Sequence, residues 1–161
     1  MAEDRHTAAG RGLTELIVEV FRLNGRLLVS GDRLVAELGL TSARWQVLGA
    51  IDLAETPQPV AWLARSMGLN RQGVQRVVNE LETEGFVEFR PNPHHRRAHL
   101  VALTNRGGAA YAAVQRRQIP WVNALAKGLH ANDVKAATEL LATVRQRLEA
   151  EINASSAAND G

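Results

Sequence analysis

Residues 60–104 constrain the fold of this chain most, because a helical pattern changes there into a strand pattern within one short segment. The helical part predicts two helices, 60–67 and 70–84, joined by a turn at Gly68. In the second helix, apolar residues recur at spacings of three and four: Val74, Val77, Val78 and Leu81. Such a stripe has to face a core, so the opposite face of this helix is exposed.

The exposed face of the second helix carries one kind of side chain, long or planar and rich in hydrogen-bond donors: Arg71, Gln72, Gln75, Arg76 and Asn79. Arginine, glutamine and asparagine can each make paired hydrogen bonds to a purine edge in the major groove of DNA. Most of these residues lie in the first turns, the part of a recognition helix that enters the groove. The pattern predicts a DNA-recognition helix with these contacts: Asn70, Arg71, Gln72, Gln75 and Arg76.

The segment after Gly85 predicts a two-stranded hairpin. Strand-forming residues occupy 86–90 and 99–103, and the intervening residues 91–97 are polar and rich in Pro, His and Arg. A helix-turn-helix followed by a basic hairpin is the order of a winged helix-turn-helix. We expect further DNA contacts from the wing and from residues that bind the DNA backbone: Arg44, His95, Arg96 and Arg97. Arg44 lies near the start of another predicted helix, which is capped at residues 40–42 and extends through Leu53.

Composition limits the function classes. The chain has 161 residues, 45% of them hydrophobic, which is enough for one domain or for one domain with an added dimerisation element. Its 19 Lys and Arg against 17 Asp and Glu create no global basic field, so nucleic-acid binding has to come from charge placed on one face. The sequence has no cysteine, which excludes disulfides and thiol chemistry. A charged N-terminus and the lack of a long apolar run predict a cytoplasmic protein without a membrane segment.

Residues 40–104 are called the reader below. The segments outside them carry more apolar surface than a small DNA-binding domain needs. We expect a mainly α-helical fold of six helices and one hairpin, in which 40–104 is the winged helix-turn-helix. Helices at 13–38 and 105–153, with a kink expected at Pro120, are predicted to dimerise, and 1–12 and 154–161 are predicted to be flexible tails. Packing across a two-fold axis would hold two readers one turn of DNA apart, about 34 Å.

The chain resembles the MarR family of winged-helix transcriptional regulators over essentially its whole length. The resemblance rests on four segments: 40–48, 63–74, 81–87 and 91–107. It implies a double-stranded DNA operator as partner, and a wing-tip arginine, here Arg97, that enters the minor groove. The family usually has an aspartate two positions before this arginine, but His95 stands there, so Arg97 lacks that carboxylate brace. A histidine here could make a pH-sensitive DNA contact, or it is a solvated loop residue.

The resemblance also implies an effector pocket between the reader and the dimerisation helices, for a small aromatic or anionic molecule. Its candidate lining is the set of aromatic residues Phe21, Trp45, Tyr111 and Trp121, although aromatic residues at helical spacing are more often ordinary core. We expect no cofactor and no metal site, because His94, His95 and His99 do not have the convergent arrangement that a metal needs. Nucleophile, phosphate-loop and metalloprotease motifs are missing from the sequence, which argues against an enzyme.

These observations predict a homodimeric DNA-binding regulator, a repressor released by a small-molecule effector. Two alternatives remain. One is a DNA-binding dimer that does not respond to an effector, and the other is a helical small-ligand-binding protein in which the polar face at Arg71–Asn79 has no function.

Overall fold

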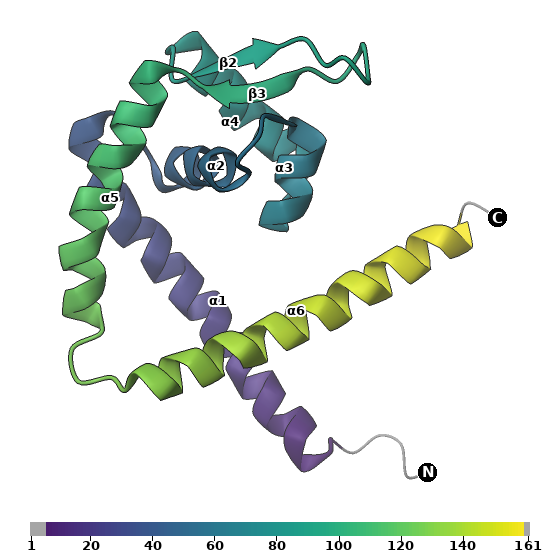
Figure 1. The fold of residues 1–161 in the computed structure, drawn as a ribbon. Helices are drawn as coiled ribbons and strands as arrows, with labels where there is room; N and C mark the ends of the chain where they lie inside the picture. Colours follow the sequence, from purple (N-terminus) through teal and green to yellow (C-terminus); the bar gives the residue numbers. More distant parts are fainter. Residues whose placement is uncertain (1–5, 160–161) are drawn as a thin grey trace. The chain divides into compact units, whose positions relative to one another are not determined.

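The computed structural model describes residues 6–159, which divide after Pro120 into two compact units. The described chain is mainly helical with a small three-stranded antiparallel sheet, as expected for a winged helix (Figure 1). Within residues 6–159, no helix is both long enough and apolar enough to cross a membrane.

The first helix, α1, runs from Ala8 to Val35 and continues into a 3-10 turn, η1, at Ala36–Leu38. It begins before the expected Leu13 because the Thr7 hydroxyl oxygen caps it, accepting a hydrogen bond from the Gly10 amide at 3.0 Å. Part of the expected N-terminal tail is therefore helical, while residues 1–5 lie outside the described residues.

Helix α2 (Ser42–Leu53) has Thr41 as its N-cap and packs closely on α1. The Ser42 hydroxyl donates to the Leu28 carbonyl at 2.9 Å, and the Ser42 amide donates to Asp32 Oδ1 at 2.6 Å. A Cβ added to Gly31 would collide with the Ser42 hydroxyl. The glycine therefore marks the close approach of the two helices.

Helices α3 (Val60–Met67) and α4 (Arg71–Thr83) form the predicted helix-turn-helix. Gly68, with φ of 64°, ends α3 in the left-handed conformation that glycine adopts at little cost. The predicted apolar stripe of α4 is buried and packs against α2 and α3, in a core that also contains Leu48 and Leu63.

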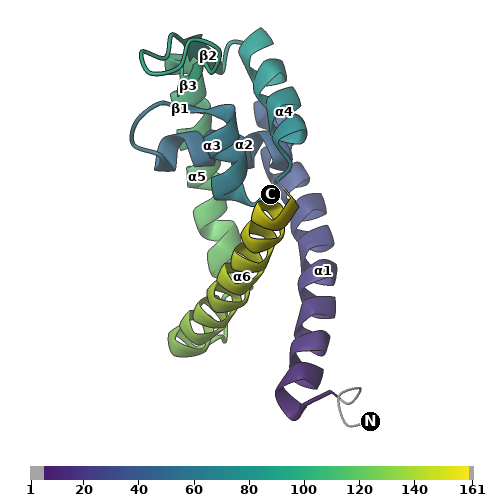
Figure 2. The ribbon, with the colours of Figure 1, turned by 90° about the vertical axis from the view of Figure 1, so that its right-hand side faces the viewer.

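The wing contains the predicted two-stranded hairpin, and a third strand extends it into a three-stranded sheet. Strands β2 (Val87–Arg90) and β3 (Leu100–Leu103) pair in antiparallel register, with Glu88 opposite Ala102. A short strand, β1 (Gln58–Pro59), pairs with the other edge of β3. The sequence predicted no strand in this segment. Proline is tolerated there because β1 is an edge strand. This pairing ties the wing to the start of α3, and Figure 2 shows the sheet and α4 at the same end of the first unit.

Helix α5 (Asn105–Leu125) starts against the base of the wing. The Thr104 hydroxyl accepts a hydrogen bond from the Gly107 amide at 3.0 Å and donates one to the Gly85 carbonyl at 2.7 Å. One side chain therefore joins the start of α5 to the residues that follow α4. The Arg106 guanidinium lies 4.6 Å from the centre of the Phe86 ring.

The second unit, from Trp121 onward, contains the end of α5 and helix α6 (Ala131–Asn159). The expected C-terminal tail is helical as far as Asn159, and residues 160–161 lie outside the described residues. The large apolar side chains on α6 are exposed in the single chain: Val134, Leu140, Leu141, Leu148 and Ile152.

Gly107 provides a test of how tightly α5 packs on the wing base. A Cβ at this buried position would overlap the Phe86 backbone carbonyl, whereas nothing lies within 4 Å of a Cβ at the neighbouring Gly108. We expect Gly107→Ala to lower the free energy of unfolding by about 1–3 kcal/mol. Gly108→Ala should instead raise it, by up to about 1 kcal/mol, because alanine is the better helix former. Thermal and urea unfolding measure both, and equal stabilities for the two variants would contradict the packing described here.

Candidate nucleic-acid interface

The polar face of α4 is displayed on the surface as the sequence predicts. Arg71, Gln72, Arg76 and Asn79 are exposed and Gln75 is half-buried, while the opposite face is in the core. These five side chains line a shallow hollow of about 710 Å³ together with Glu80 and Thr83. The helix therefore presents a surface rich in hydrogen-bond donors that can enter a DNA groove.

Asn70 begins this helix as its N-cap. Its side-chain oxygen accepts hydrogen bonds from the backbone amides of Gln72, at 2.7 Å, and Gly73, at 3.4 Å. The Asn70 carboxamide oxygen is thus engaged within the helix, and its Nδ2 is the part that can donate outward.

Gln75 and Asn79 form a hydrogen-bonded pair one turn apart on the reading face. Gln75 Nε2 donates to Asn79 Oδ1 at 2.8 Å, which orients both amides. Asn79 was placed on this face from the sequence but was not counted among the contacts. The spacing of four residues on a helix is the signal that could have identified the pair.

Arg97 lies beside the recognition helix. It lines a hollow of about 350 Å³ with side chains from α4 (Arg71, Gln75 and Asn79), from the wing (Phe89, Ala98 and His99) and from residues 59–61. The fold therefore brings the wing arginine and the start of α4 to one surface. Two arginines around one hollow favour an anionic partner.

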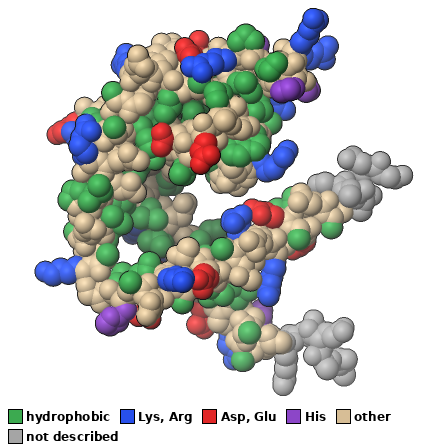
Figure 3. Space-filling model, in the orientation of Figure 1, with side chains coloured by type: hydrophobic (Ala, Val, Ile, Leu, Met, Phe, Trp, Pro, Cys, Tyr) green, Lys and Arg blue, Asp and Glu red, His purple; other side chains and the backbone are tan. Residues whose placement is uncertain are grey.

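The wing tip carries exposed basic side chains on an organised turn. His94, His95, Arg96 and Arg97 are all exposed, and Figure 3 shows basic and histidine side chains at the end of the wing. Asn92 Nδ2 donates to the Ala98 carbonyl at 2.9 Å, and Asn92 Oδ1 accepts from the His94 amide at 3.0 Å. In place of the aspartate brace, the Asn92 carboxamide thus holds the two sides of the tip together. No three His, Cys, Asp or Glu side chains in the described part of the chain are placed to hold a metal ion.

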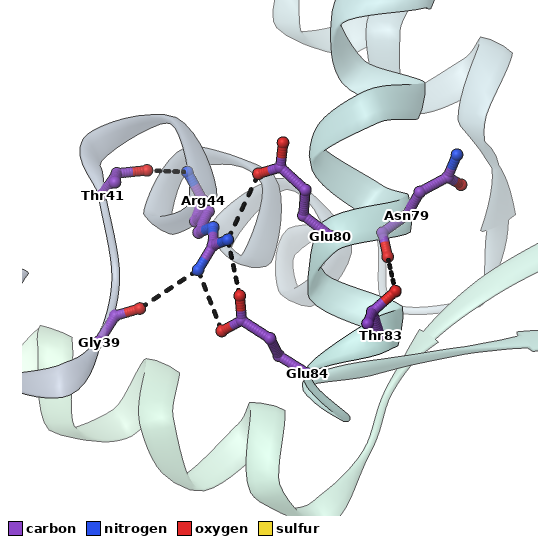
Figure 4. A network of polar contacts seen from close by, with 7 residues as sticks. All are labelled: Gly39, Thr41, Arg44, Asn79, Glu80, Thr83 and Glu84. Carbon is purple, nitrogen blue, oxygen red and sulfur yellow. Dashed lines mark hydrogen bonds and ion pairs between the residues drawn. The ribbon is translucent and has the colours of Figure 1, made fainter.

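Arg44, which the sequence predicts to contact the DNA backbone, pairs with two carboxylates of its own chain. Its guanidinium forms ion pairs with Glu84, at 2.7 Å, and with Glu80, at 3.4 Å, at the far end of α4 (Figure 4). The Arg44 side chain is 18% exposed. In the chain without DNA, the Arg44 guanidinium is therefore neutralised by carboxylates at the end of α4.

Within the first unit, the candidate effector residues Phe21, Trp45 and Tyr111 lie at different places. Trp45 lines a groove of about 390 Å³ between α2 and α3, and Trp62, which the sequence analysis missed, lies in the same groove. Tyr111 packs on α2, with its hydroxyl 3.2 Å from the position of a Cβ on Gly49. Phe21 is 72% exposed on α1, in a separate surface hollow, and Trp121 belongs to the second unit. Trp45 and Trp62 therefore share one groove, which is a candidate aromatic site in the first unit.

Comparison with known proteins places these features in a family. The profile of the MarR family matches residues 38–98. An uncharacterized protein of Mycobacterium tuberculosis is 37% identical over 139 residues, covering 86% of this chain and 96% of that protein. The multiple antibiotic resistance protein MarR of Escherichia coli is 34% identical over 108 residues, covering 62% of this chain and 73% of MarR.

Solved structures agree with this result. The crystal structure of an Escherichia coli MarR mutant complexed with operator DNA matches with a TM-score of 0.67 and 28% identity, covering 82% of this chain and 97% of that one. Sequence, fold and the arrangement of α4 and the wing lead to the same conclusion: this chain belongs to the MarR family of transcription regulators.

Proposed function

We propose that this protein is a sequence-specific DNA-binding transcription regulator that acts as a homodimeric repressor. The observation that carries the proposal is the continuous surface formed by the polar face of α4 and by Arg97 of the wing. On DNA, α4 lies in the major groove and Arg97 reaches the neighbouring minor groove. The solved complex of an Escherichia coli MarR mutant with operator DNA supports DNA binding by this fold.

Dimerisation follows from apolar surface that the single chain leaves exposed. Ile17 and Phe21 on α1 are 39% and 72% exposed, and the apolar side chains of α6 are exposed as well. A second copy of the chain would remove this surface from water, and a two-fold axis would place two α4 helices about 34 Å apart. We therefore propose that α1 and the helices after residue 105 are the dimerisation elements.

The proposed effector is a small aromatic molecule bound at the Trp45–Trp62 groove. The residues around this groove are apolar or neutral: Trp45, Gln46, Gly49, Ala50, Leu53, Ala54, Trp62, Ser66 and Met67. A ligand there would contact both α2 and α3. It could change operator affinity only if it binds a dimer whose two α4 helices fit the operator with a different affinity from a dimer whose α4 helices do not fit. Such coupling is typically about 1–3 kcal/mol.

A gel-shift assay tests this function. The DNA is the region upstream of the protein's own coding sequence, with and without phenolic ligands. A specific shift that a ligand reverses supports the effector-released repressor. A specific shift that no ligand changes supports a DNA-binding dimer without effector response, whereas no specific shift would leave the polar face of α4 without a function and favour a helical ligand-binding protein.

Base reading and backbone binding have different signatures. We expect Gln75→Ala to relax the preference at one base pair, with a loss of about 1–3 kcal/mol on the operator and little change on random DNA. Arg97→Ala should weaken binding to both DNAs and lower the slope of log affinity against log salt by about 0.9. Fluorescence anisotropy over a salt series measures both effects. Equal weakening of operator and random DNA by Gln75→Ala would argue against base reading.

The dimer interface can be tested on α6. We expect the double variant Leu141→Glu with Leu148→Glu to sediment as a monomer or to aggregate, because it places charge on the apolar stripe. The matched control, Gln146→Glu with Asn153→Asp, adds the same charge elsewhere on the helix and should remain dimeric. Sedimentation velocity distinguishes these results, and a stable dimer of the leucine variant would rule out this interface.

A further inference from the structure

We propose that Arg44 is a positioning residue for DNA recognition: it holds the C-terminal end of α4, and with it the start of the wing, at the angle that operator binding requires. The proposal rests on the proposed DNA-binding function. It assigns Arg44 an action through Glu80 and Glu84 rather than a contact with DNA.

Both terminal nitrogens of the Arg44 guanidinium contact the Glu84 carboxylate. Its Nη1 donates to Glu84 Oε2 at 3.0 Å, and its Nη2 pairs with Glu84 Oε1 at 2.7 Å (Figure 4). Two parallel bonds between the planar groups of arginine and carboxylate fix orientation as well as distance. Nη2 also meets Glu80 Oε2 at 3.4 Å, one turn earlier on α4.

The other end of the contact is equally fixed. Arg44 Nη1 donates to the Gly39 carbonyl at 3.4 Å, and the Arg44 amide donates to the Thr41 hydroxyl at 3.3 Å, at the N-cap of α2. The arginine therefore joins the connection before α2 to the last turn of α4. Its positive charge also lies near the carbonyl end of α4, where a cation is favoured.

Glu84 is the residue at which the recognition helix ends and the path to the wing begins. It is the C-cap of α4, and it is followed by Gly85, with φ of 77°, and by the buried Phe86 before β2. A shift of Glu84 therefore moves both the end of α4 and the base of the wing. These two elements carry the proposed contacts to the major and minor grooves.

The ion pairs of Arg44 are too weak to decide whether the protein folds, so their effect on the position of α4 can be measured separately. The Glu80 and Glu84 side chains are 44% and 40% exposed, and ion pairs this open to water contribute little to stability. The buried stripe of α4 keeps the helix in the core without them. Variants at Arg44 should fold, so their DNA binding can be measured.

Arg44 could act by charge alone, because Glu80 lines the same hollow as Arg71 and Arg76 and an unpaired carboxylate there would repel phosphate. Two variants distinguish charge from position. The triple variant Arg44→Met, Glu80→Gln and Glu84→Gln removes the ion pairs and also the negative charge. The exchange variant Arg44→Glu, Glu80→Gln and Glu84→Arg restores one ion pair in reverse and leaves no second carboxylate beside it.

The test would measure the affinity of the wild type and of both variants for operator and random DNA over a salt series. Thermal unfolding and amide hydrogen exchange of the free proteins would be measured alongside. The triple variant should lose about tenfold in operator affinity, keep its affinity for random DNA and its salt slope, and unfold near the wild-type temperature. Its amides at residues 85–87 should exchange faster than in wild type, and the exchange variant should regain most of the operator affinity.

Three results would overturn the proposal. Operator binding by the triple variant at wild-type strength would show that Arg44 acts only by neutralising the carboxylates. Equal weakening on both DNAs with a salt slope lower by about 0.9 would show a phosphate contact by Arg44. Unchanged exchange at residues 85–87 would show that the ion pairs do not hold this segment. A wild-type protein that binds neither DNA overturns the proposed function itself, and the exchange measurement still decides whether Arg44 holds α4.

Discussion

Burial of one face of α4 is the constraint on which the rest of the reader depends. Val74, Val77, Val78 and Leu81 are each at most 8% exposed, against a core supplied by α2 and α3. Each buried side chain of this size contributes roughly 1.5–3 kcal/mol. Because a helix is rigid, burying this stripe also determines which side chains of α4 face water.

The wing depends on α4 through short connections. Gly85 and Phe86 lead directly from the helix into β2, the Thr104 hydroxyl bonds back to the Gly85 carbonyl, and β1 holds the far edge of β3. The hairpin is therefore held at its base by Thr104 and along the start of β3 by β1, while its tip is organised by Asn92. This arrangement brings Arg97 to the hollow that Arg71 and Gln75 also line.

The helix-turn-helix could be read closely from the sequence because its signals are local. The bounds of α3 and the buried stripe of α4 agree with the sequence-based prediction, and α4 starts one residue after the predicted Asn70. Strand β1 was missed because Gln58 and Pro59 carry no strand pattern, and β3 supplies their pairing from a distant part of the chain. Trp62 was missed as well, because the groove that it shares with Trp45 exists only once α2 and α3 are packed.

Arg44 shows most clearly where sequence and tertiary structure divide. The sequence by itself determined the helices, the buried stripe and the polar face of the recognition helix, since caps, glycines and spacings of three and four act within a few residues. For an arginine near the start of a helix, such as Arg44, no local sequence pattern indicates which carboxylate it will pair with. Packing of α2 against α4 decided that Arg44 meets Glu80 and Glu84, because a charged side chain is neutralised by whichever carboxylates the fold brings within reach.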